Sequence, residues 1–149
     1  MDAFFEEVNH KTDEKVHSLW VEKYRPSTLD GYIGNENLRE TIKRFISDQN
    51  IPHLMFYGGA GTGKTTLAKL ITKNINCDVL YINASDENRV DDVRTKIKSF
   101  ASCVGFKPLK VIILDESDYM SREAQAALRN LMETFSLTTK FILTCNYHE

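Results

Sequence analysis

The sequence of 149 residues has no long hydrophobic run, no basic leader at its N-terminus and no large excess of charge of either sign. No apolar stretch approaches the roughly 20 residues that a membrane-spanning helix needs. We therefore expect neither a membrane anchor nor a targeting segment. The formal net charge is −2, so any contact with nucleic acid must come from a local basic patch rather than from the overall field.

Cysteine is also scarce, and the chain has no internal repeat or low-complexity linker. Cys77, Cys103 and Cys145 lie far apart and form no C-x-x-C pair. This usage fits isolated buried thiols in a reducing compartment better than disulfides or a zinc site. The length suits one compact domain. We expect an intracellular protein of the cytoplasm or nucleus.

One strong motif is present, Gly58-Gly59-Ala60-Gly61-Thr62-Gly63-Lys64-Thr65, which matches the G-x-x-x-x-G-K-[ST] phosphate loop at each fixed position. It lies between the apolar run Leu54–Tyr57 and a stretch with helical spacing of apolar residues. Glycines let successive backbone N–H groups turn inward around a phosphate. We expect Lys64 to bind the β- and γ-phosphates and the Thr65 hydroxyl to complete the coordination of Mg²⁺. The alternative, a glycine-rich turn with a chance lysine, is disfavoured by the flanking strand and helix.

Short apolar runs alternate with amphipathic stretches along the rest of the chain. This alternation predicts an α/β fold with a parallel, doubly wound sheet and flanking helices, and the phosphate-loop motif identifies it as a P-loop NTPase core. The predicted strands are Leu54–Tyr57, Val79–Ile82, Lys110–Leu114 and Lys140–Thr144. Helices are predicted from Asn35 to Asp48, after the phosphate loop, from Asp86 onward, and after Ser121 as N-cap. The unbroken apolar run in Lys110–Leu114 indicates a strand buried on both faces.

Polar residues follow three of these strands directly, where open α/β sheets place ligand-binding groups. We expect Asp115 to hold magnesium through its coordinated waters, and Glu116 to orient or deprotonate the water that attacks the γ-phosphate. Paired carboxylates also occur as acids at helix starts. Asn83 and Asn146 could contact the water, the γ-phosphate or Glu116, although by spacing alone each could be a plain turn residue.

Residues 1–17 mix charged residues without a sustained period, which predicts a flexible tail ahead of a domain that spans residues 18–149. Pro26 keeps Arg25 out of the helical region, so Trp20 and Tyr24 belong to an extended segment. These aromatic residues could anchor the tail to the core or pack on a flat ligand.

Three segments in this order resemble one family: Val21-Glu22-Lys23-Tyr24-Arg25-Pro26, Ile82-Asn83-Ala84-Ser85-Asp86 and Asp115-Glu116-Ser117-Asp118. Together they are similar to the small subunits of sliding-clamp loaders, which are AAA+ ATPases such as replication factor C and its phage and archaeal counterparts. The resemblance runs from about Trp20 to Asn146. It implies an ATPase core that couples ATP binding to clamp opening, and DNA-triggered hydrolysis to clamp release, during DNA replication.

The resemblance also implies ligands, partners and a location. ATP and Mg²⁺ would be the cofactors, and the partners would be other clamp-loader subunits in a ring, the sliding clamp and primer-template DNA. If a phage encodes the chain, it would act in the cytoplasm of the infected cell.

Individual roles follow from the same resemblance. It implies catalytic roles for Lys64, Glu116 and Asn146, with Asn146 as the sensor that positions the water. Asn83 would be a switch that holds Glu116 inactive until DNA binds, and Thr65 and Asp115 would hold the metal. The implied nucleotide-binding residues are Val21, Tyr24, Arg25 and Ile33 around the adenine, and Gly59, Gly61, Thr62, Gly63, Lys64, Thr65 and Thr66 around the phosphates.

Two macromolecular surfaces are implied as well. Arg94 and Lys98 on one predicted helix, with Arg122 and Arg129 on the next, are similar to the inner surface that follows the phosphates of primer-template DNA. Each of these cations could instead belong to a solvated helix face. The stretch from Phe100 to Leu109 resembles the end that touches the clamp.

The resemblance is incomplete, because a whole small subunit would continue with a fifth strand, an arginine that reaches a neighbour's nucleotide, a helical lid and a collar domain. Without the fifth strand, Leu54–Tyr57 is expected to be an edge, with marginal stability or self-association. Two other functions remain open. One is a nucleotide-binding or assembly module without turnover, which is favoured over activity for this chain by itself. The other is a DNA helicase, because the acidic box of that class is also similar to Asp115-Glu116-Ser117-Asp118.

Overall fold

The computed structural model describes residues 26, 28–32, 34–86 and 90–146. Within these residues four strands form one parallel sheet in the order β1-β4-β3-β2. The strands are β1 (Leu54–Tyr57), β2 (Cys77–Asn83), β3 (Leu109–Asp115) and β4 (Thr139–Cys145). The helices are α2 (Glu36–Asp48), α3 (Lys64–Asn74), α4 (Val90–Ser102) and α5 (Arg122–Thr134), with a 3₁₀ turn, η1 (Ser117–Tyr119), between β3 and α5.

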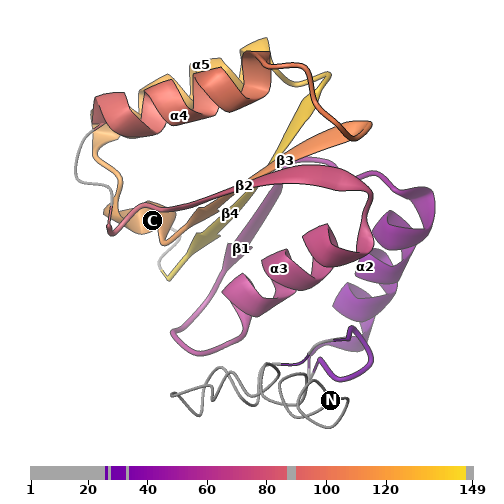
Figure 1. Ribbon diagram of the computed structural model, residues 1–149. Coiled ribbons are helices and arrows are strands. Elements are labelled where there is room, and N and C mark those ends of the chain that lie inside the picture. Colours follow the sequence, from indigo (N-terminus) through magenta and orange to yellow (C-terminus); the bar gives the residue numbers. More distant parts are fainter. Residues whose placement is uncertain (1–25, 27, 33, 87–89, 147–149) are drawn as a thin grey trace, which may run out of the picture.

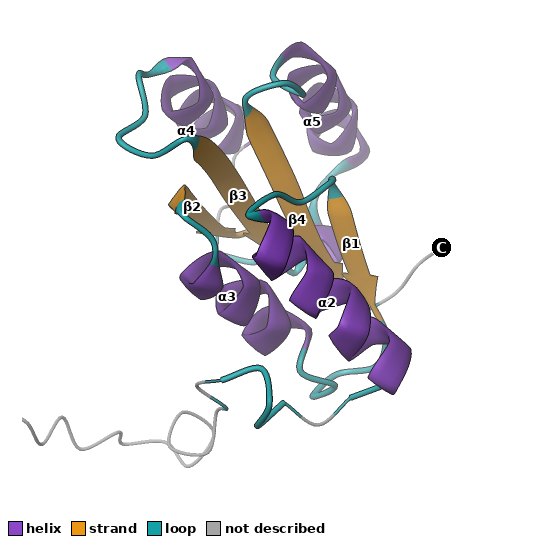
Figure 2. Ribbon diagram, turned by 90° about the vertical axis from the view of Figure 1, so that its right-hand side faces the viewer, coloured by secondary structure: helices purple, strands orange, loops and turns teal. Residues whose placement is uncertain are grey.

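Helices cover both faces of this sheet. In Figures 1 and 2, α2 and α3 lie on one face, and α4 and α5 lie side by side on the other. This layering confirms the predicted parallel, doubly wound α/β fold. None of the helices in the described part of the chain is long and apolar enough to cross a membrane.

The burial of each strand follows from its place in the sheet. β3 and β4 are central, and their sequences LKVIILD and TKFILTC are buried almost throughout. For β3 this confirms the burial on both faces that its unbroken apolar run predicted. β1 and β2 stand at the two edges of the described sheet and alternate between covered and exposed residues. The expected edge position of Leu54–Tyr57 is therefore observed among the described strands.

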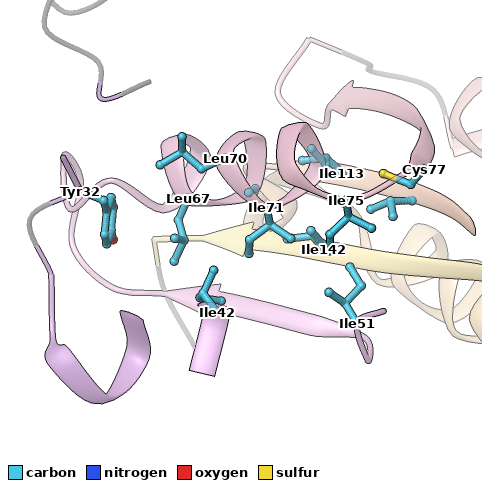
Figure 3. Packing of buried hydrophobic residues seen from close by; sticks show 12 residues of the cluster. Tyr32, Ile42, Ile51, Leu67, Leu70, Ile71, Ile75, Cys77, Ile113 and Ile142 are labelled. Atoms are coloured by element: carbon cyan, nitrogen blue, oxygen red, sulfur yellow. The ribbon is translucent and has the colours of Figure 1, made fainter. Parts of the chain in front are cut away.

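Two hydrophobic cores result, one on each face of the sheet. On the face of α2 and α3, Ile42, Leu67 and Ile71 pack with Ile113 and Ile142 from the central strands (Figure 3). The core on the face of α4 and α5 contains Ile97, Leu128, Ile112 and Phe141. Burial of two separate apolar stripes fixes the sheet between its helices.

The observed boundaries differ from the predicted ones in one informative place. Helix α4 begins at Val90, whereas Asp86, its predicted start, lies in a turn. The side-chain oxygen of Asn83 accepts hydrogen bonds from the Ser85 backbone N–H (3.0 Å) and hydroxyl (2.9 Å), and the Asp86 N–H donates to the Asn83 carbonyl (3.3 Å). This local turn competes with a helix start. The predicted N-cap at Ser121 is confirmed, since its hydroxyl accepts from the Ala124 N–H at 3.2 Å.

The cysteines are all free thiols, as expected, but they are not all buried. Cys77 and Cys145 are buried in strands, whereas Cys103 is exposed just after α4. Cys103 is exposed because it lies just beyond the end of α4, and the spacing of cysteines along the sequence does not predict this position.

A histidine connects the edge strand to the centre of the sheet. His53 directly precedes β1, its Nδ1 accepts a hydrogen bond from the Phe141 N–H at 3.1 Å, and its ring lies 5.5 Å from the Phe141 ring. Burial, together with the positive charge of Lys140, lowers the pKa of His53 below its usual value. The folded chain therefore favours the neutral imidazole.

We predict that the chain loses stability as the pH falls below about 6.5, the ordinary histidine value. Below that pH the unfolded chain takes up a proton at His53 before the folded chain does, so unfolding is favoured; above it, this contribution is fully present. Urea unfolding of the wild type and of His53→Asn, which keeps an acceptor but does not titrate, measures the effect. A parallel fall in the stability of both proteins between pH 7.5 and 5.5 would exclude His53 as its source.

Candidate nucleotide-binding site

The phosphate loop takes the conformation that its glycines permit. Backbone φ angles are 149° at Gly58, 74° at Gly61 and 86° at Gly63, a range that side chains with a Cβ rarely adopt. Gly63 caps the N-terminus of α3, whose first turn carries no acidic side chain and no side-chain cap. The backbone N–H groups at the start of α3, the positive end of the helix dipole, thus remain available to an anion.

Two polar side chains of the loop, Thr62 and Lys64, fold back over it. The Lys64 ammonium donates to the carbonyls of Gly58 (2.9 Å) and Gly59 (2.7 Å), and the Thr62 hydroxyl donates to the Gly59 carbonyl at 2.9 Å. The positive charge is therefore held at the mouth of the loop, where phosphate oxygens can replace the carbonyls as acceptors. Thr66 follows in the first turn of α3.

Tyr32 packs against the phosphate loop at Gly63, a contact that no sequence pattern predicted. Its ring is buried, which raises the pKa of its hydroxyl, and it stands beside Leu67 in Figure 3. A Cβ at Gly63 would lie 3.1 Å from Tyr32 Cε2. Gly63 is thus required twice, for its positive φ and for the close approach of this ring. The only sequence signal was the position of Tyr32 between two glycines, Gly31 and Gly34.

Asp115, at the end of β3, receives hydroxyl hydrogen bonds from three other elements. Thr65 of α3 donates at 2.8 Å to Oδ1 and 3.0 Å to Oδ2, Tyr81 of β2 donates to Oδ2 at 2.6 Å, and Thr144 of β4 donates to Oδ1. Burial by itself would raise the pKa of Asp115, but the hydrogen bonds from Thr144, Tyr81 and Thr65, with the charge of Lys69, outweigh it and lower the pKa. The carboxylate is therefore ionised at neutral pH.

This arrangement fits a magnesium ion that is shared with a nucleotide. Mg²⁺ prefers oxygen ligands, keeps several waters, and uses one or two protein groups together with substrate phosphates. Thr65 and Asp115 supply a hydroxyl and a carboxylate in contact at the side of the phosphate loop. Among the described residues, no group of three or more His, Cys, Asp or Glu side chains is placed to hold a metal ion.

Glu116 leaves the strand in a different direction from Asp115. Its backbone is left-handed, with φ 55° and ψ 43°, and it caps the 3₁₀ turn η1. Its N–H donates to the Thr144 hydroxyl at 3.1 Å, and the Ser117 hydroxyl donates to the Thr144 carbonyl at 2.9 Å. Thr144 thereby fixes both carboxylate residues, although the sequence analysis assigned it no role. A threonine as the last residue of a predicted strand carried no recognisable signal.

The two asparagines lie at the same edge of the sheet as the carboxylates. Asn83 is the register partner of Asp115 between β2 and β3, and its amide oxygen accepts from Ser85 as described above. Asn146 follows β4, and its N–H lies 3.4 Å from Asp118 Oδ1. The carboxyl ends of parallel strands thus collect Asn83, Asp115 and Asn146, as predicted. Their individual roles remain predictions.

The four cations expected to follow DNA lie on α4 and α5, two on each helix. Arg94 and Lys98 line a cavity of about 440 Å³ between α4 and α5. Arg129 instead lines a different cavity of about 830 Å³ beside β1. Arg122 is exposed at the first position of α5.

The loop between α4 and β3 presents an apolar tip. Val104 and Phe106 are almost fully exposed. Asp78 Oδ2 accepts from the N–H groups of Phe106 (2.7 Å) and Lys107 (3.1 Å), which holds the loop against β2. The tip is therefore an exposed apolar surface on a fixed loop, within the stretch expected to touch the clamp.

The residues predicted to surround the adenine, Val21, Tyr24, Arg25 and Ile33, lie outside the described residues. The residues predicted around the phosphates and the metal are brought together: the loop, Lys64, Thr65 and Asp115 form one site at the start of α3. Tyr32, Tyr81 and Thr144 are additional members that the structure supplies.

Comparison with known proteins gives close sequence relatives. The chain is 48% identical over 136 residues to a replication factor C small subunit of Sulfurisphaera tokodaii, covering 87% of this chain and 42% of the relative. It is 46% identical over 150 residues to a probable replication factor C subunit 5 of Dictyostelium discoideum, covering 92% of this chain and 43% of the relative. The chain thus spans less than half the length of these relatives.

Solved structures show the same fold at lower identity. A Thermotoga maritima RuvB Holliday junction branch migration motor superposes with a TM-score of 0.60 at 23% identity, covering 83% of this chain and 41% of that one. Another Thermotoga maritima RuvB structure superposes with a TM-score of 0.63 at 21% identity, and the match covers 83% of this chain and 42% of the RuvB chain. These likenesses concern the fold alone.

A family model covers most of the described core. Residues 54–149 match the model of the ATPase family associated with various cellular activities, AAA. The match begins at β1 and includes the phosphate loop and the carboxylates after β3. Together with the geometry of the site, it shows that this chain belongs to the AAA family.

Proposed function

We propose that this chain is the ATP-binding and ATP-hydrolysing core of a sliding-clamp loader small subunit. The observation that carries the proposal is the contact of the Thr65 hydroxyl with the Asp115 carboxylate at 2.8 Å, which joins the phosphate loop to residues 50 positions later. Identity of 46–48% with replication factor C small subunits supports this function over that of other P-loop ATPases. The RuvB structures, at 19–23% identity, give no comparable support for a helicase.

Each part of the site has a chemical task in this proposal. The loop N–H groups and the Lys64 ammonium bind the phosphates, and Thr65 and Asp115 hold a magnesium ion and its waters. The bound Mg²⁺ supplies positive charge against the phosphate oxygens. Glu116 takes a proton from the attacking water, and Asn146 positions that water. Asp115 is held by hydroxyl hydrogen bonds, whereas Glu116 follows it in a left-handed turn, and we assign the two carboxylates different tasks.

The coupling to DNA and clamp involves the opposite face and the sheet edge. Asn83 restrains Glu116 until DNA contacts the α4 and α5 surface, where Arg94 and Lys98 stand. The exposed tip with Val104 and Phe106 contacts the clamp. ATP binding then supports clamp opening, and hydrolysis triggered by primed DNA supports clamp release.

ATP hydrolysis by the chain, alone and with clamp, primed DNA and partner subunits, tests the proposal. Hydrolysis that requires the complete mixture would support a conditional clamp-loader core. Binding of ATP without turnover in any mixture would instead identify a nucleotide-binding or assembly module. Strand separation without a clamp would favour a helicase.

We predict that Lys64→Ala weakens ATP binding by roughly ten- to a hundred-fold, because the variant has no positive charge at the mouth of the loop. Titration with a fluorescent ATP analogue measures this change. Lys73→Ala removes a lysine from the exposed last turn of the same helix and should leave the affinity unchanged. Tight binding by Lys64→Ala would contradict the assigned role.

Glu116→Gln should keep ATP binding and reduce hydrolysis by roughly 10²–10⁴-fold, because an amide cannot accept the proton of the attacking water. Single-turnover hydrolysis in the complete assembly, measured beside ATP affinity, separates the two effects. Glu133→Gln, on the exposed side of α5, serves as the control. Normal turnover by Glu116→Gln would remove Glu116 from the mechanism.

A double replacement of Arg94 and Lys98 by Ala should weaken DNA binding by the assembly at low salt. The slope of log affinity against log salt should decrease by about 0.9 for each phosphate that these two side chains neutralise in the wild type. Lys73→Ala, on the other face of the sheet, should not change the slope. An unchanged slope in the double variant would assign both cations to a solvated helix face.

A further inference from the structure

Tyr81 contacts the metal-binding carboxylate from a position that the proposed mechanism does not use. It lies on the edge strand β2, and 42% of it is exposed. A tyrosine at such a position ordinarily leaves its hydroxyl in water. Here the ring instead leans over the sheet toward α3, where the Lys69 ammonium lies 5.0 Å from the ring centroid. The hydroxyl reaches Asp115 Oδ2 at 2.6 Å.

The register of the strands explains this reach. Tyr81 is paired with Ile113, two residues before Asp115, so Tyr81, Ile113 and Asp115 point to the same face of the sheet. The long side chain of Tyr81 covers the remaining distance along the strand direction. A contact of 2.6 Å between a hydroxyl and an ionised carboxylate is in the range of strong, charge-assisted hydrogen bonds.

Each oxygen of Asp115 has one hydroxyl donor of its own, and a third hydroxyl lies within reach of both. Thr144 donates to Oδ1 alone, and Tyr81 donates to Oδ2 alone. Thr65 lies within 2.8 Å of Oδ1 and 3.0 Å of Oδ2, so its single proton is shared between them. Tyr81 is therefore the dedicated donor to Oδ2 among the described residues, and with Thr144 it fixes the rotation of the carboxylate.

We propose that Tyr81 is a positioning residue that orients the Asp115 carboxylate toward the waters of the bound magnesium. The inference rests on the proposed binding of a magnesium nucleotide at this site. Without the Tyr81 hydroxyl, Oδ2 keeps only the shared proton of Thr65, and the carboxylate can turn about its Cβ–Cγ bond. Thr65 lies slightly closer to Oδ1 than to Oδ2, so it is a weaker restraint on Oδ2 than the Tyr81 hydroxyl at 2.6 Å.

Nucleotide binding at increasing Mg²⁺ concentration tests this role, with Tyr81→Phe, the wild type and a control. The phenylalanine keeps the ring beside Lys69 and removes only the hydroxyl. We expect the Mg²⁺ concentration for half-maximal binding of a fluorescent ATP analogue to rise by roughly three- to ten-fold in Tyr81→Phe. Binding of the analogue in EDTA should not change, whereas the melting temperature of the free chain should fall, because the buried Asp115 carboxylate loses one of its donors. Tyr119→Phe, which also removes an exposed tyrosine hydroxyl, should match the wild type throughout.

Each other outcome overturns the proposal. An unchanged Mg²⁺ requirement in Tyr81→Phe would show that the hydroxyl does not position Asp115. An equal loss of affinity with and without Mg²⁺ would show a general effect on the phosphate loop. A wild-type chain that binds the analogue without any Mg²⁺ dependence would overturn this inference together with the proposed metal site, whereas the first two outcomes would leave the proposed ATPase function intact.

Discussion

The buried charge of Asp115 is the constraint on which the site depends. Only 5% of this residue is exposed, and an ionised carboxylate at that depth is stable only when hydrogen bonds replace its water. The donors come from α3, β2 and β4, which are the helix and the two strands that surround β3. The hydrogen bonds of this one side chain therefore depend on the strand order β4-β3-β2 and on the position of α3 against the sheet.

The site has two halves, one that offers positive groups and one that offers oxygen ligands. On the loop side, backbone N–H groups at the start of α3 and the Lys64 ammonium offer positive charge, and Gly63 lets Tyr32 support the loop closely. On the sheet side, oxygen atoms of Asp115 and Thr65 offer the ligands that a hard cation prefers. A polyphosphate with its magnesium ion fits both halves. The phosphate oxygens would bind the positive groups of the loop, and the magnesium ion would bind on the side of the Asp115 and Thr65 oxygens.

The sheet also separates two kinds of surface. The nucleotide groups lie at the α3 face and at the carboxyl edge, whereas the cations of α4 and the apolar loop tip belong to the opposite layer. Glu116 stands between them, since its left-handed backbone turns the chain from β3 into η1 and toward α5. Only a short stretch of backbone therefore joins α5 to the residue proposed to activate water.

The sequence by itself determined the local features: the phosphate loop, the buried strand that ends in Asp115, the Ser121 cap and the alternation of strands and helices. These depend on short-range periodicity, glycine spacing and single capping residues, all legible within about a dozen positions. Only the tertiary structure decided that Tyr32, Tyr81 and Thr144 join the site. The hydrogen bonds to Asp115 join residues some 29 to 50 positions apart, and they exist because of strand order and helix rotation, which no local pattern encodes.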